Sequence, residues 1–357
     1  MKPQYRATMF KARAALEALR CGIVSPAVTD LMASYGRDNE LDVLKNHIQQ
    51  NENGSSQILV GGYGVGKSHL LEILTQHLLE QGYAVAALEL GSSNERAENP
   101  DAVLKAIEHS FQVKIATEFI AGAEGMFLLQ RAMNTREFMP SRSVLDGMKE
   151  LREHFLERFG NLTELVENQN LSSQIPAAMT AANRVVGKLV EFAMQLKSEV
   201  KVKGFVILFD EAERSEWAYT LHRATQAQNL MTWFATRSAN KSTKALKTYR
   251  DEYNSDLQTS SFLHTIFAFT HKFGLAQVLS NRLNIPVIQL KIIDRSNRIA
   301  IAEQIGLIYQ IAYNQKKGQL RKKLLDNVLE NTDNEDIRLF TRTIVAALDH
   351  LRLGEPS

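Results

Sequence analysis

The sequence predicts an α/β fold with a parallel β-sheet at its core and further helices around it. A short apolar run at 57–60 passes into a cluster of glycines and then into a helix-periodic segment at 68–81, which is the order strand, loop, helix. Further runs at 83–90 and 205–209 are rich in apolar residues, as expected of strands that are buried on both faces. This alternation of strands and helices favours a parallel sheet.

Helices are predicted before, inside and after this core. Two amphipathic segments, 7–22 and 38–50, lead into the first strand. The long segment between the second and third strands has mostly helical periodicity and no convincing strand, which predicts an insertion. Two more strands are predicted at 264–270 and 286–293, and the chain after Asp294 is predicted to be helical. The expected parts are an N-terminal helical lead-in (1–53), an α/β core (54–98 and 203–293), a mostly helical insertion (99–202) and a C-terminal helical lid (294–357).

The composition is that of a globular protein with a core of ordinary size. The sequence is 44% hydrophobic and 23% charged, and its formal net charge of +2 is far from that of a protein that coats DNA. The single cysteine, Cys21, excludes an internal disulfide and a cysteine metal cluster and suits a reducing compartment. No apolar run approaches the roughly 18 residues of a membrane-spanning helix, and the N-terminus lacks a signal-peptide pattern. We therefore expect a soluble protein of the cytoplasm.

Residues 61–68 match the phosphate-loop pattern G-x-x-x-x-G-K-[ST] at every fixed position. In such a loop the glycines let backbone N–H groups point at phosphate oxygens, a lysine (Lys67) reaches the β- and γ-phosphates, and a hydroxyl (Ser68) ligates Mg²⁺ at a helix N-terminus. A glycine turn with a surface lysine is the alternative, but the flanking strand and helix favour ATP and Mg²⁺ as ligands. The residues expected around the nucleotide are Gly61, Gly62, Tyr63, Gly64, Val65, Gly66, Lys67, Ser68 and His69.

The apolar run at 205–209 is followed by two carboxylates, Asp210 and Glu211. An Asp at the carboxyl end of a buried parallel strand can hold Mg²⁺, and a following Glu can orient and deprotonate the attacking water. The pattern is common in isolation, and its place after a phosphate loop favours a hydrolytic site. For Glu213, two positions further on, we expect no more than a solvated helix start.

Three weaker signals follow in the C-terminal third of the chain. Thr270, at the end of a predicted strand, could sense the γ-phosphate or position the water, or could only cap the strand. Arg282 could reach the nucleotide of a neighbouring subunit as an arginine finger, or could be a plain surface residue. Of Arg338 and Arg342, at i, i+4 in the last predicted helix, Arg338 is expected to contact the γ-phosphate, with a salt-bridged helix face as the alternative.

One basic stretch offers a candidate DNA contact, because its residues recur at three- and four-residue spacings on a predicted helix. A solvated face remains the favoured interpretation, since Asp251 and Glu252 follow at once. The residues of the stretch are Arg237, Lys241, Lys244, Lys247 and Arg250.

Taken in this order, the phosphate loop, the acidic strand end, Thr270, Arg282 and Arg338 resemble the AAA+ superfamily, closest to its initiator-like and STAND-like branch. Four segments also resemble the ATP-binding protein family of bacterial BREX phage-defence systems. The resemblance implies an ATPase that acts with partner proteins on or near DNA. The segments that carry it are 12–22, 62–72, 210–213 and 337–342.

The motifs and the resemblance together predict an oligomeric AAA+ switch or motor that hydrolyses ATP in a DNA-linked complex of prokaryotic anti-phage defence. A nucleotide-gated scaffold or recruiter, of the kind used in DNA transposition or replication initiation, is the alternative, with little hydrolysis. The intact Glu211 argues against that alternative. A small-molecule kinase is disfavoured by Glu211 and by the C-terminal lid.

Overall fold

The computed structural model describes residues 3–23, 25–32, 36–91, 97–136, 143–159, 181–216, 220–240, 260–272, 274–314, 328 and 336–353. The chain divides into two compact units. The first, called here the loop–lid unit, comprises Met1–Val43, Gly61–Leu74 and Gln289–Ser357. The second, the sheet unit, comprises Leu44–Val60 and Thr75–Ile288.

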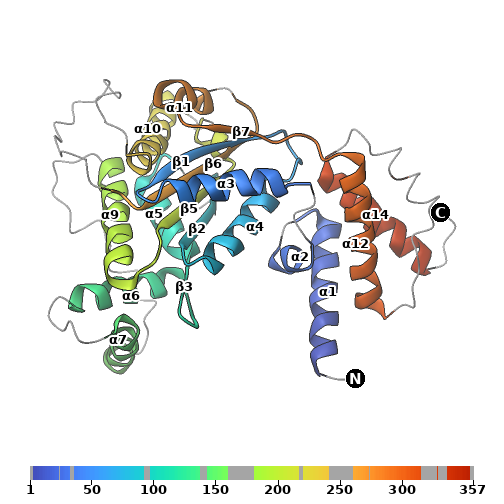
Figure 1. The fold of residues 1–357 in the computed structure, drawn as a ribbon, viewed down its shortest axis with the longest axis horizontal. Coiled ribbons are helices and arrows are strands. Elements are labelled where there is room, and N and C mark those ends of the chain that lie inside the picture. Colours follow the sequence, from blue (N-terminus) through green and yellow to red (C-terminus); the bar gives the residue numbers. More distant parts are fainter. Residues whose placement is uncertain are drawn as a thin grey trace. The chain divides into compact units, whose positions relative to one another are not determined.

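The sheet unit is built on a seven-stranded sheet with the order β4-β3-β2-β5-β6-β1-β7 (Figure 1). The four strands β2, β5, β6 and β1 run parallel, which confirms the predicted α/β fold with a parallel sheet. Strand β6 lies between β1, which leads into the phosphate loop, and β5, which ends in the acidic pair. The strands are β1 Ser55–Val60, β2 Ala84–Glu89, β3 Phe111–Ile115, β4 Glu118–Ala121, β5 Phe205–Asp210, β6 Leu263–Phe269 and β7 Val287–Gln289.

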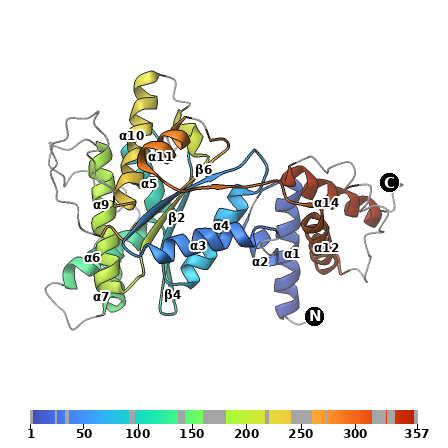
Figure 2. The same ribbon diagram turned by 45° about the horizontal axis from the view of Figure 1, so that its top comes forward.

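The central strands are apolar because helices cover them. Every residue of β6 is buried, and in β5 only the terminal Asp210 is partly exposed. Phe209 of β5 stacks on Phe267 of β6, with ring centroids 5.1 Å apart, and meets Phe234 of α10 edge to face. Helices α9 and α10 lie side by side against the sheet (Figure 2). The helices of this unit are α5 Pro100–Ser110, α6 Gly122–Arg136, α7 Val144–Phe159, α9 Ala181–Gln195, the π-helix η2 Leu196–Val200, the 3-10 helix η3 Ala212–Glu216, α10 Leu221–Ser238 and α11 Leu275–Leu283.

The segment predicted to be free of strands contains an antiparallel hairpin, so that prediction is wrong. Strand β3 pairs with β2, and β4 pairs with β3. The signal was a short alternation at 111–115, in which Phe111 and Val113 are buried whereas Gln112 and Lys114 are not. Ala116 turns the chain in the left-handed region, at φ 53°. The alternation covers only five residues and lies between two segments of strong helical periodicity. A pattern this short does not stand out from the helical pattern around it.

A buried polar pair lies at the amino-terminal ends of two strands, where Ser55 of β1 is in register with His264 of β6. The Ser55 hydroxyl and His264 Nδ1 are 2.8 Å apart, and the ring of Tyr83 meets the imidazole edge on. Burial, with smaller contributions from His47 and Lys197, lowers the pKa of His264 to about 3. The imidazole is therefore neutral in the folded protein at neutral pH.

This pKa predicts an acid-sensitive core. The unfolded chain binds a proton at His264 near pH 6.5 and the folded chain does not, so stability is lost as pH falls through the window from 6.5 towards 3. The expected slope is at most about 1.4 kcal/mol per pH unit. Urea unfolding at several pH values should show a weaker pH dependence for His264→Asn, whose amide can still bond Ser55. Equal slopes for the variant and the wild type would contradict the prediction.

The loop–lid unit joins the N-terminal lead-in to the C-terminal helices. Helices α1, α12 and α14 lie side by side (Figures 1 and 2) and share one core, to which Leu16, Ile305 and Phe340 contribute fully buried side chains. Among the described helices, none combines the length and apolar composition that a bilayer crossing requires. The helices are α1 Pro3–Cys21, α2 Pro26–Leu31 (which the sequence did not predict), α3 Asp38–Gln50, α4 Lys67–Glu80, α12 Arg295–Tyr313 and α14 Ile337–Leu353; α3 and α4 contribute residues to both units.

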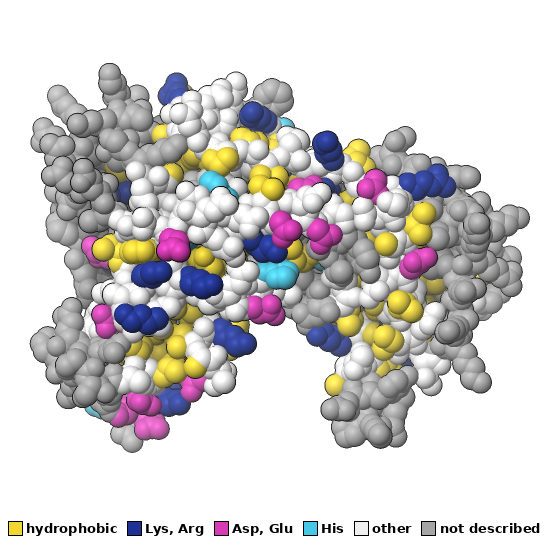
Figure 3. Space-filling view, in the orientation of Figure 1, with side chains coloured by type: hydrophobic (Ala, Val, Ile, Leu, Met, Phe, Trp, Pro, Cys, Tyr) yellow, Lys and Arg dark blue, Asp and Glu magenta, His cyan; other side chains and the backbone are white. Residues whose placement is uncertain are grey.

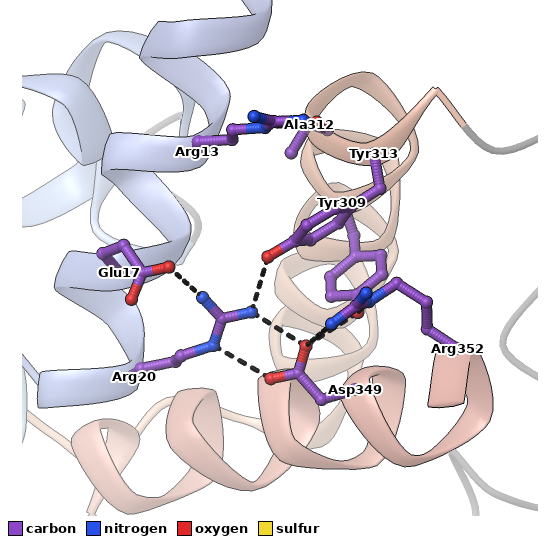
Figure 4. A network of polar contacts seen from close by, with 8 residues as sticks. All are labelled: Arg13, Glu17, Arg20, Tyr309, Ala312, Tyr313, Asp349 and Arg352. Carbon is purple, nitrogen blue, oxygen red and sulfur yellow. Dashed lines mark hydrogen bonds and ion pairs between the residues drawn. The ribbon is translucent and has the colours of Figure 1, made fainter. Parts of the chain in front are cut away.

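A polar network connects helix α1 to helices α12 and α14 (Figure 4). Arg20 of α1 donates to both carboxylate oxygens of Asp349 on α14, at 2.9 and 2.8 Å, and to the Tyr313 hydroxyl at 2.9 Å. The Tyr309 hydroxyl of α12 donates to Asp349 at 2.7 Å and accepts from Arg352 at 2.8 Å. Bidentate ion pairs of this kind fix geometry as well as adding stability. Helix α1 is therefore part of the same packed body as α12 and α14.

Candidate nucleotide site

The phosphate loop lies between β1 and α4, as the sequence predicts. Gly64 and Gly66 have φ values of 73° and 96°, a region that side chains other than glycine rarely adopt. A Cβ on Gly61 would approach Val65 to 2.7 Å and Leu290 to 2.9 Å. Helix α4 begins at Lys67, so the backbone N–H groups of its first turn face the loop, where anions are favoured. The loop thus has the backbone form that a phosphate group requires.

Lys67 curls back over the loop that precedes it. Its Nζ donates to Gly61 O at 2.7 Å and to Gly62 O at 3.2 Å, and the side chain is only 9% exposed. The ammonium group is therefore held within the loop before any phosphate arrives. This position suits the predicted role of Lys67 as the cation that meets the β- and γ-phosphates.

An arginine that the sequence did not single out supports the loop from the lead-in. Arg37 is 4% exposed and donates to the carbonyl oxygens of Val65 at 2.8 Å and Lys291 at 2.6 Å, and it pairs with Glu40 at 2.9 Å. The two terminal nitrogens of the buried guanidinium donate to carbonyl and carboxylate oxygens, which offsets the cost of burying the charge. One arginine before a helix carries no sequence signal of such a role, since its partners lie 28 and 254 positions away.

The start of α14 touches the phosphate loop directly. Arg338 donates to the Tyr63 hydroxyl at 2.6 Å, and its guanidinium lies over the Tyr63 ring, 5.0 Å from the centroid. The Ile337 N–H donates to Gly64 O at 3.0 Å, and a Cβ on Gly64 would overlap the side chain of Asp336. Of the two arginines considered for the γ-phosphate, Arg338 therefore contacts the loop, whereas Arg342 is exposed.

In the sheet unit, the carboxyl ends of the parallel strands form one edge. Val60 of β1 is in register with Phe269 of β6, and Asp210 of β5 with Glu89 of β2. Gly61, the first residue of the phosphate loop, follows Val60 directly in the chain. The Asp210 carboxylate accepts from the Glu211 N–H at 2.9 Å. Parallel strands bring their carboxyl ends together, which is why ligands of α/β sheets bind at this edge.

Glu211 occupies a strained and crowded position. Its φ of 51° is left-handed, at a cost of about 1–2 kcal/mol for a residue with a side chain. Burial raises the pKa of Glu211, and the carboxylates of Glu89, Asp210 and Glu213 add to the rise, while Arg214 opposes it through an ion pair with Glu211. Arg214 also lies 3.8 Å from Glu89. A carboxylate with a raised pKa is suited to accept a proton from water.

Glu213 lies at the start of a helix, η3, as expected, but the expectation that it is solvated is wrong. Its side chain is 6% exposed, and its carboxylate accepts from the Thr270 N–H at 3.2 Å and from the Thr270 hydroxyl. Thr270, which follows β6, therefore binds Glu213, which lies just beyond the acidic pair at the end of β5. Sequence reasoning missed this because the two residues are 57 positions apart and an acidic residue after a strand is usually solvated.

The remaining predicted residues fall in different environments. Arg282 is exposed in the last turn of α11 and makes no hydrogen bond or ion pair to another described residue, so its role stays a prediction. Arg237 is only 8% exposed and lies over the Trp233 ring, so it does not belong to an exposed basic face. The other members of the basic stretch, Lys241, Lys244, Lys247 and Arg250, lie outside the described residues. On the face drawn in Figure 3, Lys and Arg side chains of the described residues are mixed with Asp and Glu.

For the metal, the described residues contain no group of three His, Cys, Asp or Glu side chains placed to hold an ion. The two residues predicted for Mg²⁺, Ser68 and Asp210, offer a hydroxyl and a carboxylate oxygen. Oxygen donors suit Mg²⁺, which in nucleotide sites takes few protein ligands and completes its shell with phosphates and water. The donor types therefore fit this ion.

Part of the chain, including the phosphate loop, matches a family of ATP-binding proteins. Residues 9–123 match the family model of the BREX system ATP-binding protein BrxC/D, which confirms the resemblance for this part of the chain. No curated protein matches the chain. Among solved structures, it is similar to a DNA replication initiation factor, with a TM-score of 0.40 and 12% identity over 90% of this chain and 62% of that one. It is also similar to AMPPCP-bound DnaA from Aquifex aeolicus, with a TM-score of 0.39 and 12% identity over 90% of this chain and 63% of that one. The chain spans less than two thirds of the length of both solved proteins.

Proposed function

We propose that this chain binds ATP with Mg²⁺ and hydrolyses it, and that hydrolysis switches the conformation of a DNA-linked complex in prokaryotic anti-phage defence. The observation that carries the proposal is the phosphate loop, with Lys67 drawn into it and Arg338 resting on Tyr63. The match of residues 9–123 to a BREX ATP-binding family supports the defence role.

Each residue then has a distinct task. Lys67 neutralises charge on the β- and γ-phosphates, and Ser68 and Asp210 supply oxygen ligands to the metal. Bound Mg²⁺ would supply positive charge next to the phosphates. Glu211 takes a proton from water as the water oxygen bonds to the γ-phosphorus and the bond from phosphorus to the bridging oxygen breaks, which yields ADP and phosphate.

The partners follow from the arginines and from the family match. Arg282 is exposed at the end of α11, where a second copy of the chain can present its nucleotide to it, so the proposal includes a homo-oligomer. Double-stranded DNA and other proteins of a defence or DNA-transaction complex complete the proposal. The Lys241, Lys244 and Lys247 stretch is the candidate DNA contact.

One observation favours a second candidate function, a nucleotide-gated recruiter with little hydrolysis. Arg214 pairs with Glu211, and an ion pair keeps a carboxylate from acting as a base until the partner leaves. In a recruiter, ATP binding alone would set the assembly, and Glu211 would stay paired.

The deciding experiment measures ATP binding, ATP turnover and native mass for the purified chain, each with and without double-stranded DNA. Turnover together with a larger mass in ATP is the expected result for the switch. Binding and a mass change without turnover would favour the recruiter. A chain that does not bind ATP would overturn both.

A further inference from the structure

The 3-10 helix η3 comes directly after Asp210 and Glu211 and carries two further carboxylates that contact other elements of the sheet unit. Glu213 binds Thr270 at the end of β6, and Glu216 accepts from the Leu275 N–H at the start of α11. The N-cap of α11 is Gly274, which offers no side-chain acceptor, so the Glu216 carboxylate takes that place. Helix η3 thus joins the end of β5 to two neighbours.

The contact between Glu213 and Thr270 uses both hydrogen-bond donors of Thr270. The backbone N–H goes to Glu213 Oε2 at 3.2 Å, and the hydroxyl proton goes to Oε1. A carboxylate that is only 6% exposed requires such donors, because a buried charge without hydrogen bonds is costly. The Thr270 hydroxyl therefore has a fixed orientation, with its proton directed at Glu213 and its lone pairs left to accept.

This orientation separates the two roles that a hydroxyl could play at this strand end. Phosphate oxygens accept hydrogen bonds and do not donate them, so a hydroxyl that has already given its proton cannot bond the γ-phosphate. A water molecule can donate an O–H to the Thr270 hydroxyl, and Glu211 follows the neighbouring strand β5, which pairs in parallel with β6. A hydroxyl locked as an acceptor is therefore suited to hold the attacking water.

We propose that Glu213 is a positioning residue that locks the Thr270 hydroxyl as a hydrogen-bond acceptor for the attacking water. The inference rests on the proposed ATPase function and adds to it Glu213, the residue that fixes the hydroxyl to which the attacking water binds. Glu213 touches neither ATP nor water in this scheme, and its effect passes through Thr270.

The test is steady-state ATP turnover for wild type, Glu213→Gln, Thr270→Val, the double variant and Thr270→Ser. Glutamine keeps the size of Glu213 but presents an NH₂ group to one of the two Thr270 donors. We expect kcat to fall about 10- to 100-fold in Glu213→Gln and in Thr270→Val, because a misplaced reactant costs up to that much. KM for ATP should stay within about threefold, and Thr270→Ser should retain wild-type kcat. The double variant should be no slower than the slower single variant, since both changes remove one interaction.

Glu216→Gln is the matched control, because it makes the same chemical change on the same helix and keeps an acceptor for the Leu275 N–H. It should leave kcat unchanged. A wild-type kcat for Glu213→Gln, additive effects in the double variant, or a change in KM in place of kcat would each overturn the inference. If Glu213→Gln does not fold by circular dichroism, the comparison of Thr270→Val with Thr270→Ser still decides, because equal rates for these two would overturn it.

Glu211→Gln in the same assay separates this inference from the proposed function. If Glu211→Gln lowers the turnover of the wild type and Glu213→Gln does not, only the positioning role is overturned. Absence of wild-type turnover overturns both.

Discussion

Replacing Glu211 with glutamine is expected to lower ATP turnover by at least about 100-fold, because general-base catalysis contributes about 10²- to 10⁴-fold. Glutamine keeps the size and the hydrogen-bonding capacity of the side chain but cannot accept the proton of the attacking water. ATP binding should be retained, since Glu211 follows strand β5 and is not part of the phosphate loop. Measuring phosphate release checks the loss of turnover, and measuring ATP affinity on the same preparation checks that binding is retained.

The pH profile provides an independent check on the same residue. Burial raises the pKa of Glu211, and a base works only when it is deprotonated, so activity should fall on the acid side at a pH above the ordinary range for glutamate. Arg214 lowers the pKa of Glu211 by favouring its charged form. Arg214→Ala should therefore move the loss of activity on the acid side to still higher pH. If Glu211→Gln hydrolyses ATP at the wild-type rate, Glu211 is not the base.

Replacing Lys67 with alanine is expected to weaken ATP binding about 10- to 100-fold and to abolish measurable turnover. Each hydrogen bond from a charged group contributes about 1.5–3 kcal/mol, and about 1.4 kcal/mol is a factor of ten in affinity. The ammonium already lies within the loop, so little reorganisation is needed for phosphate to meet it. Titration of a fluorescent ATP analogue measures the affinity.

Lys272→Ala is the control for this variant, because Lys272 is an exposed lysine of the sheet unit. It should bind and hydrolyse ATP like the wild type. Thermal unfolding of Lys67→Ala is needed alongside, since the Lys67 ammonium also binds Gly61 O and Gly62 O. Wild-type affinity in a folded Lys67→Ala protein would refute the phosphate-loop assignment.

Most of the parallel core was predictable because its signals are local. The apolar runs at 57–60 and 205–209 lie within β1 and β5, and the helix predicted at 38–50 is α3, residue for residue. The hairpin at 111–121 was missed because its alternation is short and lies between strong helices. The strand predicted at 286–293 is only Val287–Gln289, because an apolar run can also continue as an irregular segment.

The phosphate loop and the acidic pair can be recognised from the sequence alone, because each is a run of neighbouring residues whose chemistry depends on their order. Folding brings distant residues into contact with them. It placed Arg338 on Tyr63 of the phosphate loop, and it buried Glu213 against Thr270. Such contacts join residues tens to hundreds of positions apart, and packing and hydrogen-bond satisfaction, which no local pattern encodes, bring them together.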